Sequence, residues 1–356
     1  MGQAGCGGGK RPIGDHGDDP VTDLTVLDCG PGTSVQDAGR LGHRRYGVPT
    51  AGAMDRSALA AANLLVGNGP FAAAIEFTLI GGRFRVGEAG VLVAVAGPGL
   101  SLCIDGQKVL THHSAYAPAG AVLEVSPIRG GVYGYLAIRG GLTSPLAMGS
   151  RSAHIRSGIG GVALTAGDIL TCSASDSNEP ELAGDATALG GINGKGGPFR
   201  VVPGPQDGEF EQGALNRFLS SPYTVSPQSD RMGQRLSGAS LCHPGGHNIV
   251  SDGVVPGSVQ VPGDGQPIVL MRDAQTTGGY PKIATVISAD LGRLAQTLPG
   301  GTVRFRAVTM AQAQEAARRM AAGLLGLAKG VHPADIRSLP ERLSGENLIS
   351  GIVADD

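Results

Sequence analysis

The feature that most constrains this fold is a series of short hydrophobic segments between Ile75 and Thr171, separated by glycine-rich turns. Apolar and polar residues alternate in several of them, which places the apolar side chains on one face of a strand. Strands at this spacing, without regular helical segments between them, favour a barrel or sandwich over a parallel sheet. We therefore expect a mainly β fold with a few helices. The segments are IEFTLI, RFRV, VLVAVA, SLCI, AVLEV, YGYLAI and DILT.

The chain is long enough for two domains, because its 356 residues exceed an ordinary domain of roughly 150 residues. It contains 60 Gly and 23 Pro, but 41% of its residues are hydrophobic, which is enough to fill a core between turns. A polar, glycine-rich segment, 173–198, is the expected boundary. The expected organisation is a disordered tail (1–22), a first β unit (23–172), a linker (173–198), a second β unit with a C-terminal helix (199–332) and a peripheral tail (333–356).

Helix start signals mark several segments. Thr309 with Gln312 three residues later forms a capping box, in which each side chain bonds to the other residue's backbone N–H. Asp55 and Asp290 are expected to cap shorter helices with their carboxylates. The expected helices are RSALAAANLLV after Asp55, ended by Gly67, then residues 209–219, the segment from Asp290 to Leu298, and the segment from Thr309 to about Leu327.

Charge and cysteine content exclude several classes of protein. The formal net charge is −2, and no basic run is interleaved with aromatic residues, so nucleic-acid binding is not expected. Five widely separated cysteines without a CxxC pair fit a reducing compartment. No apolar run reaches the roughly 18 residues that a membrane span needs. A cytoplasmic protein without a membrane association is expected.

Common ligand motifs are weak or missing. GINGKGG (191–197) lacks the upstream Gly and the Ser or Thr of a phosphate-binding loop, and we interpret it as linker. GIGGVA (158–163) matches a loose dinucleotide pattern but is expected to be a turn. His243 and His247 are separated by Pro-Gly-Gly, which excludes a helical zinc pair, and no metal site is expected. There is no GxSxG serine-hydrolase motif and no Met-Lys-Met biotin segment.

Two polar clusters remain as candidate sites. One lies in and after the long irregular segment 33–55 and comprises Gln36, Asp37, Arg40, Asp55, Asn63, Asn68 and Glu76. The other joins SDRMGQRL (229–236), the loop region 251–267 and DAQTTGGYPK (273–282). Arg231 and Arg235 could hold a carboxylate or phosphate, or form structural forks to Asp230 or Asp252. Asp55 could equally be only a helix cap.

The second cluster includes a Gly-Gly pair, Gly278 and Gly279, between two hydrophobic runs. Without a Cβ, these residues allow a ligand to approach backbone N–H groups closely. A simple solvated turn is the alternative interpretation. The segment is therefore a candidate pocket wall.

Long ordered motifs in both clusters, GTSVQDAGRLGHRRYGVPTAGAMD, SDRMGQRL and SDGVVPGSVQVPGDGQPIVLMRDAQTTGGYPKIATVISADLGRLAQTLPG, resemble the biotin-dependent carboxyltransferase family, also called allophanate hydrolase subunit 2. The resemblance extends from about Leu24 to Val308. The family includes the C subunits of 5-oxoprolinase (KipA proteins) and the matching part of urea carboxylase. It implies two cyclophilin-like β-barrel units and an obligate subunit 1 (KipI-like) partner.

The resemblance implies three possible functions. The first is a subunit that acts with the KipI-like protein and a lactam-utilisation subunit in ATP-dependent hydrolysis of a lactam to glutamate. ATP would then be a co-substrate of the complex, since this chain has no nucleotide motif. The second is a carboxyltransferase subunit for urea or an amide, with biotin on a separate carrier. The third is a regulatory protein that controls its partner. The lactam reaction is preferred because the chain carries no biotin segment of its own.

Both chemistries need an activated carbonyl and stabilisation of a developing oxyanion. We hypothesise that backbone N–H groups near Gly278 and Gly279, with Gln275 and Thr276, supply donors, while Tyr280 or Asp37 moves a proton. Arg40 or Arg231 could neutralise a substrate carboxylate or phosphate. The expected catalytic residues are Gln275, Thr276, Tyr280 and Asp37, and the expected substrate-binding residues are Gln36, Arg40, Asp55, Arg231, Arg235, Gly278, Gly279 and Lys282.

Overall fold

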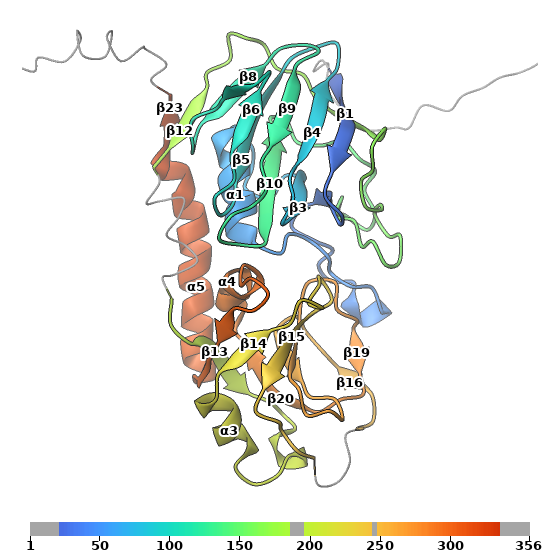
Figure 1. The fold of residues 1–356 in the computed structure, drawn as a ribbon, viewed down its shortest axis with the longest axis vertical. Coiled ribbons are helices and arrows are strands. Elements are labelled where there is room, and N and C mark those ends of the chain that lie inside the picture. Colours follow the sequence, from blue (N-terminus) through green and yellow to red (C-terminus); the bar gives the residue numbers. More distant parts are fainter. Residues whose placement is uncertain (1–20, 186–195, 244–247, 335–356) are drawn as a thin grey trace, which may run out of the picture.

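A computed structural model describes residues 21–185, 196–243 and 248–334. Figure 1 shows an elongated molecule, with strands β1 to β11 in its upper half and strands β13 to β20 in its lower half. The predicted mainly β fold is confirmed, because strands far outnumber helices among the described residues. No helix in this part of the chain has both the length and the apolar character that crossing a bilayer requires.

The upper half contains a six-stranded and a five-stranded sheet. The six-stranded sheet has the order β11-β1-β4-β9-β6-β7, and its strands are β1 (Val21–Cys29), β4 (Gly82–Val86), β6 (Leu102–Ile104), β7 (Gln107–Lys108), β9 (Val122–Val125) and β11 (Ile169–Ser173). The five-stranded sheet has the order β2-β3-β10-β5-β8, and its strands are β2 (Ser34–Gln36), β3 (Ala74–Thr78), β5 (Val91–Ala96), β8 (Ser114–Ala117) and β10 (Tyr133–Ile138). Every paired strand in both sheets is antiparallel to its neighbour.

Alternation explains how these strands bury their apolar side chains. In β4, Phe84 is buried while Arg83 and Arg85 on either side are exposed. All six residues of β10 are buried, because one face of its sheet packs in the core with Phe77 and Phe84, and the other is covered by α1 (Arg56–Leu65). Burial on both faces accounts for the nearly continuous apolar run YGYLAI.

The lower half is built on one eight-stranded sheet, β21-β14-β15-β18-β17-β20-β13-β22. Its core holds stacked aromatic rings, with Phe218 and Phe305 at 4.5 Å between ring centroids. A separate two-stranded ladder joins β16 (Asp252–Gly253) to β19 (Thr277–Gly278). The sheet strands are β13 (Phe199–Pro203), β14 (Tyr223–Val225), β15 (Gly233–Gly238), β17 (Ser258–Gln260), β18 (Ile268–Leu270), β20 (Lys282–Val286), β21 (Thr302–Val303) and β22 (Phe305–Ala307).

Two of the predicted helix caps are confirmed. The Asp55 carboxylate accepts hydrogen bonds from the backbone N–H groups of Ser57 and Ala58 at the start of α1. Thr309 and Gln312 form the expected capping box at the start of α5 (Met310–Gly326).

The predictions for the other two helices need correction. Asp290 does not cap α4 (Leu291–Ala295) with its side chain, because its carboxylate accepts from the backbone N–H and guanidinium of Arg200. This helix also ends before Leu298. In the segment predicted as helix over 209–219, a 3₁₀ turn, η2 (Asp207–Glu209), precedes α3 (Ala214–Ser220).

Helix α5 packs on both halves. Near its start, Ala316 clusters with Ile287 and Val308 of the lower half, whereas Leu324 near its end packs against the α1 cluster. After η4 (Leu327–Gly330), β23 (Val331–Pro333) pairs with β12 (Leu182–Gly184). Figure 1 shows α5 running along one side of the molecule from the lower to the upper half.

The segments predicted as tails and linker are partly structured. Val21 and Thr22 pair with Ser173 and Cys172, so β1 includes the last two residues of the predicted tail. The predicted linker contributes β12. Residues 1–20, 186–195 and 335–356 of these segments, and with them most of GINGKGG, lie outside the described residues, as does His247.

Candidate functional site

Two neighbouring cavities lie where the two halves meet. The first has a volume of about 430 Å³ and is lined by Tyr133 and Thr78 from the upper half and by Asp230 and Met271 from the lower half. The second has a volume of about 650 Å³. Arg156, Met232 and Asp273 line both cavities, so the two adjoin each other, and we call them together the interdomain cleft.

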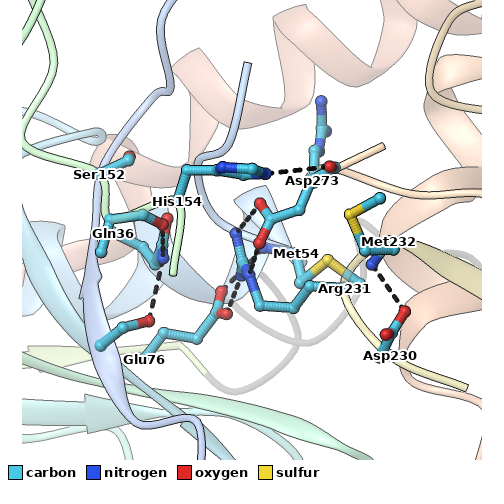
Figure 2. Close-up of polar contacts among 12 residues, drawn as sticks. Gln36, Met54, Glu76, Ser152, His154, Asp230, Arg231, Met232 and Asp273 are labelled. Carbon is cyan, nitrogen blue, oxygen red and sulfur yellow. Dashed lines mark hydrogen bonds and ion pairs between the residues drawn. The ribbon is translucent and has the colours of Figure 1, made fainter. Parts of the chain in front are cut away.

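Arg231 ties the two walls of this cleft together. Its Nε and Nη2 donate to the Asp273 carboxylate, each at 2.9 Å, and its Nη1 donates to Glu76 on β3. Nη2 also donates to the Gly52 carbonyl at 2.8 Å. Figure 2 shows Arg231 between the carboxylates of Glu76 and Asp273. The predicted structural fork of Arg231 therefore exists, but its partners are not Asp230 or Asp252.

Both carboxylate oxygens of Glu76 accept hydrogen bonds in this network. Its second carboxylate oxygen accepts from the Met54 backbone N–H at 2.8 Å and from the Tyr135 hydroxyl at 2.6 Å. Burial, followed by the charge of Glu76, raises the pKa of Tyr135, so this hydroxyl stays a donor. Burial alone would lower the pKa of Arg231, but Glu76 and Asp273 raise it, so the guanidinium stays charged.

His154 lines the second cavity and contacts this network. Its Nε2 lies 3.2 Å from the Asp273 carbonyl oxygen (Figure 2). Its Nδ1 lies 2.6 Å from the Ser157 hydroxyl. A carbonyl oxygen only accepts, so Nε2 carries the proton in the neutral ring and Nδ1 accepts from Ser157. This arrangement fixes the tautomer and orientation of the imidazole.

The segment that carries His154 is held by the first predicted cluster. The Asp37 carboxylate accepts from the hydroxyls of Ser150 and Ser152 and from the backbone N–H of Arg151 at 2.6 Å. Burial alone would raise the pKa of Asp37, but these hydrogen bonds, together with one from the Gly39 N–H, lower it. A carboxylate that is so fully bonded is a poor proton acceptor but a firm anchor.

Gln36 and Arg40 act on the same segment. The Gln36 amide donates to the Ala153 carbonyl at 2.9 Å and accepts from the Gly52 N–H. Arg40 donates through Nε to the Ala147 carbonyl at 3.1 Å and through Nη2 to the Ser152 carbonyl. Both side chains are completely buried, and neither lines the interdomain cleft. The substrate-binding role predicted for them finds no support in their positions.

Of the second predicted cluster, SDRMGQRL and the first half of DAQTTGGYPK reach the cleft, whereas the loop region 251–267 does not line it. Gln275 and Thr276 line the second cavity with His154. The Gln275 carbonyl also accepts from Arg44 at 2.9 Å, which joins η1 (Arg44–Tyr46) of the upper half to the lower half.

The remaining predicted residues lie outside the cleft lining. Gly278 pairs with Asp252 in the β16–β19 ladder, and the Gly279 carbonyl accepts from the Ile249 N–H. The Lys282 ammonium is buried and donates to the Asp252 carboxylate at 2.5 Å. Tyr280 is partly exposed, Arg235 lies on the exposed face of β15, and the Asp55 carboxylate, besides capping α1, accepts from Gln296 at 2.9 Å.

Sequence reasoning missed His154 and Arg156. They lie in segment 139–168, which separates β10 from β11 and contains no named strand or helix. A long irregular segment in a compact domain is often functional, and that signal was present in the sequence. GIGGVA within this segment is a turn with no helix after it, as predicted. Among the described residues, no three His, Cys, Asp or Glu side chains gather at metal-binding distance.

Comparison with known proteins agrees with this architecture. The family model of the carboxyltransferase domain, subdomains A and B, matches residues 46–307. The chain is 40% identical to the C subunit of 5-oxoprolinase from Escherichia coli, with 82% of this chain and 94% of that protein covered. It is 36% identical to the corresponding C subunit from Haemophilus influenzae, with 83% and 94% covered.

A solved structure extends the comparison to a larger enzyme. The crystal structure of the K. lactis urea amidolyase matches with a TM-score of 0.78 and 25% identity over 92% of this chain. The chain spans 21% of that enzyme's length. Both halves described above therefore occur together within a longer protein.

Proposed function

Because the chain belongs to the family of carboxyltransferase domains, subdomains A and B, we propose that it is the C subunit of a 5-oxoprolinase. In this reaction the amide bond of a five-membered lactam, 5-oxoproline, is opened to give glutamate at the expense of ATP. The observation that carries the proposal is the 40% identity over 94% of the E. coli protein. A KipI-like subunit 1 and a lactam-utilisation subunit would complete the cytoplasmic complex.

The interdomain cleft is the proposed substrate site. A lactam carbonyl is a weak electrophile, so its activation needs a group that moves a proton and donors that stabilise negative charge on oxygen. His154 is the proposed proton carrier, because its tautomer and orientation are fixed by Asp273 and Ser157. Gln275 and Thr276 share the second cavity with it and are the proposed donors.

Asp37 and Arg231 are proposed to support the site without contacting substrate. Asp37 is a positioning residue, since its carboxylate holds the Ser150–Ser152 backbone that leads to His154. Arg231 is a positioning residue as well, because its hydrogen bonds are directed to Glu76, Asp273 and the Gly52 carbonyl. These roles replace the proton transfer and substrate binding that the sequence suggested for them.

A second candidate function is carboxyl transfer between biotin on a separate carrier and an amide or urea. The observation in its favour is the match to the K. lactis urea amidolyase over 92% of this chain. In this reaction His154 would again be the proton carrier and would accept the proton that leaves the nitrogen as it is carboxylated.

Reconstitution with both partner proteins distinguishes the two functions. The complex is assayed for glutamate release from 5-oxoproline with and without ATP, and for carboxyl transfer to urea in the presence of a biotinylated carrier. ATP-dependent glutamate release supports the 5-oxoprolinase function. Carboxyl transfer without glutamate release supports the second candidate, and activity in neither assay contradicts both.

A further inference from the structure

Arg156 differs from every other charged side chain that lines the interdomain cleft. The lining of the two cavities contains four charged residues, namely Arg156, Asp230, Arg231 and Asp273. Arg231 and Asp273 neutralise each other through a bidentate pair. One Asp230 oxygen accepts from the backbone N–H groups of Met232 and Gly233, at 2.8 and 3.0 Å.

Arg156, in contrast, has no partner. Within residues 21–185, 196–243 and 248–334, its guanidinium makes no hydrogen bond or ion pair, although it lines both cavities. An exposed arginine on an open surface would be ordinary in this respect. This one lies at the junction of two concave spaces, with five N–H donors in a planar fork that suits a carboxylate.

The backbone that carries Arg156 is not loose. Ser150, Arg151 and Ser152 are bonded to Asp37, and the Ala153 carbonyl is bonded to Gln36. His154, two residues before Arg156, is fixed by Ser157 on the other side. Hydrogen bonds of the residues before and after Arg156 therefore fix the position of the segment that carries its charge.

We propose that Arg156 binds the carboxylate of the substrate in the interdomain cleft. The inference rests on the proposed function and narrows the substrate class to lactams that bear a carboxylate. In 5-oxoproline a single carbon separates the carboxylate from the ring nitrogen. A carboxylate bound at Arg156 would therefore place the amide within the cavity that His154 lines.

Arg156 also separates the two candidate substrate classes. Urea carries no charge and offers the guanidinium only a neutral carbonyl acceptor, whereas a carboxylated lactam gains a charge-assisted, bidentate contact. Lactams that lack the carboxylate would not gain this contact, so the cleft should bind carboxylated lactams more tightly than uncharged ones.

The test uses the reconstituted complex with two substrates, 5-oxoproline and pyrrolidin-2-one, the same ring without the carboxylate. Arg156→Ala should raise KM for 5-oxoproline by about 30-fold and leave the constants for pyrrolidin-2-one unchanged. Arg156→Lys should keep part of the binding. Arg306→Ala, which removes an exposed arginine on β22, is the matched control and should change neither substrate. Since Arg156 is exposed and unpaired, its removal should not disturb folding.

Direct binding measured by calorimetry gives a second readout that does not depend on turnover. If the wild-type complex binds 5-oxoproline more tightly than pyrrolidin-2-one and Arg156→Ala abolishes the difference, the inference stands even when no glutamate is released, a result that would overturn only the proposed function. If the wild-type and Arg156→Ala complexes discriminate equally between the two lactams, the inference is wrong while the proposed function survives. The inference is also wrong if the wild-type complex binds neither lactam.

Discussion

Arg231 and Glu76 join the two halves of the molecule through an ion pair in which both side chains are buried, 9% and 1% exposed. The pair is separated by 155 positions in the sequence. Arg231 also donates to the Asp273 carboxylate, and Glu76 also accepts from the Met54 backbone N–H and the Tyr135 hydroxyl. Removing Glu76 from this pair is costly, because the Arg231 Nη1, Met54 N–H and Tyr135 hydroxyl donors would stay buried without their acceptor.

Replacing Glu76 with Ala should therefore lower the free energy of unfolding by about 3 to 5 kcal/mol. Urea denaturation followed by circular dichroism measures the change. Asp28→Ala is the control, because Asp28 forms an exposed pair with Arg83 and its loss should have little effect. Equal stability of Glu76→Ala and wild type would show that Asp273 alone satisfies the buried Arg231 charge.

Gln296, at the C-terminal end of α4, should contribute about as much as Glu76 to the free energy of unfolding, but for a different reason. Its amide oxygen accepts from the backbone N–H groups of Val132 and Tyr133, each at 2.9 Å, and its nitrogen donates to Asp55 and to the Tyr133 carbonyl. Gln296→Ala leaves two backbone donors at the junction unpaired, which should cost about 2 to 4 kcal/mol.

Thermal unfolding of Gln296→Ala tests this, with Gln266→Ala as the control. Gln266 also bonds to backbone groups, at Gly238, but at an exposed position. If the two variants lost equal stability, the junction would contribute no more than an exposed turn.

His154→Ala should lower kcat of the reconstituted complex by about 100-fold or more, because general acid or base catalysis contributes this much. Ser157→Ala should have a smaller effect, since it removes the hydrogen bond to Nδ1 and leaves the imidazole in place. The comparison is made on kcat with saturating substrate, and His113→Ala, outside the cleft, serves as the control. Full activity of His154→Ala would contradict the proposed role.

Asp37→Asn should destabilise the protein by about 2 kcal/mol at pH 7, since hydrogen bonds to a carboxylate are stronger than those to a neutral amide. The folded-state pKa of Asp37 is lowered below its ordinary value of 3.8, so its stabilising effect is complete above that value. The effect is lost as the pH falls through the folded-state pKa. The stability difference between wild type and Asp37→Asn should therefore shrink below about pH 4. A difference that is constant from pH 7 to pH 3 would show that Asp37 acts without its charge.

Features that depend on neighbours in sequence could be predicted. The Thr309–Gln312 capping box and the Asp55 cap each involve residues within three positions, and both are confirmed. The Asp290 cap failed for a long-range reason, because Arg200, 90 positions away, bonds to the same carboxylate. Local signals are reliable until a tertiary partner competes for the same group.

The candidate site was harder to predict, because its contacts join distant segments. Gln36, Asp37 and Arg40 were correctly recognised as an unusual polar group, but their bonds to residues 147–153 give them a supporting position that sequence alone does not show. His154 contacts Asp273 across 119 positions. No periodicity marks such a pair.

Helix α5 affects the free energy with which a ligand binds in the cleft between the two halves. Its 17 residues form a rod of about 25 Å whose start packs on the lower half and whose end packs on the upper half. A rod anchored at both ends resists a hinge motion, because such a motion must bend the helix or unpack one of its ends. The cleft should therefore be preformed, with its two walls already at the distance found in the bound state. Little of a ligand's binding free energy would then be offset by the cost of ordering the protein.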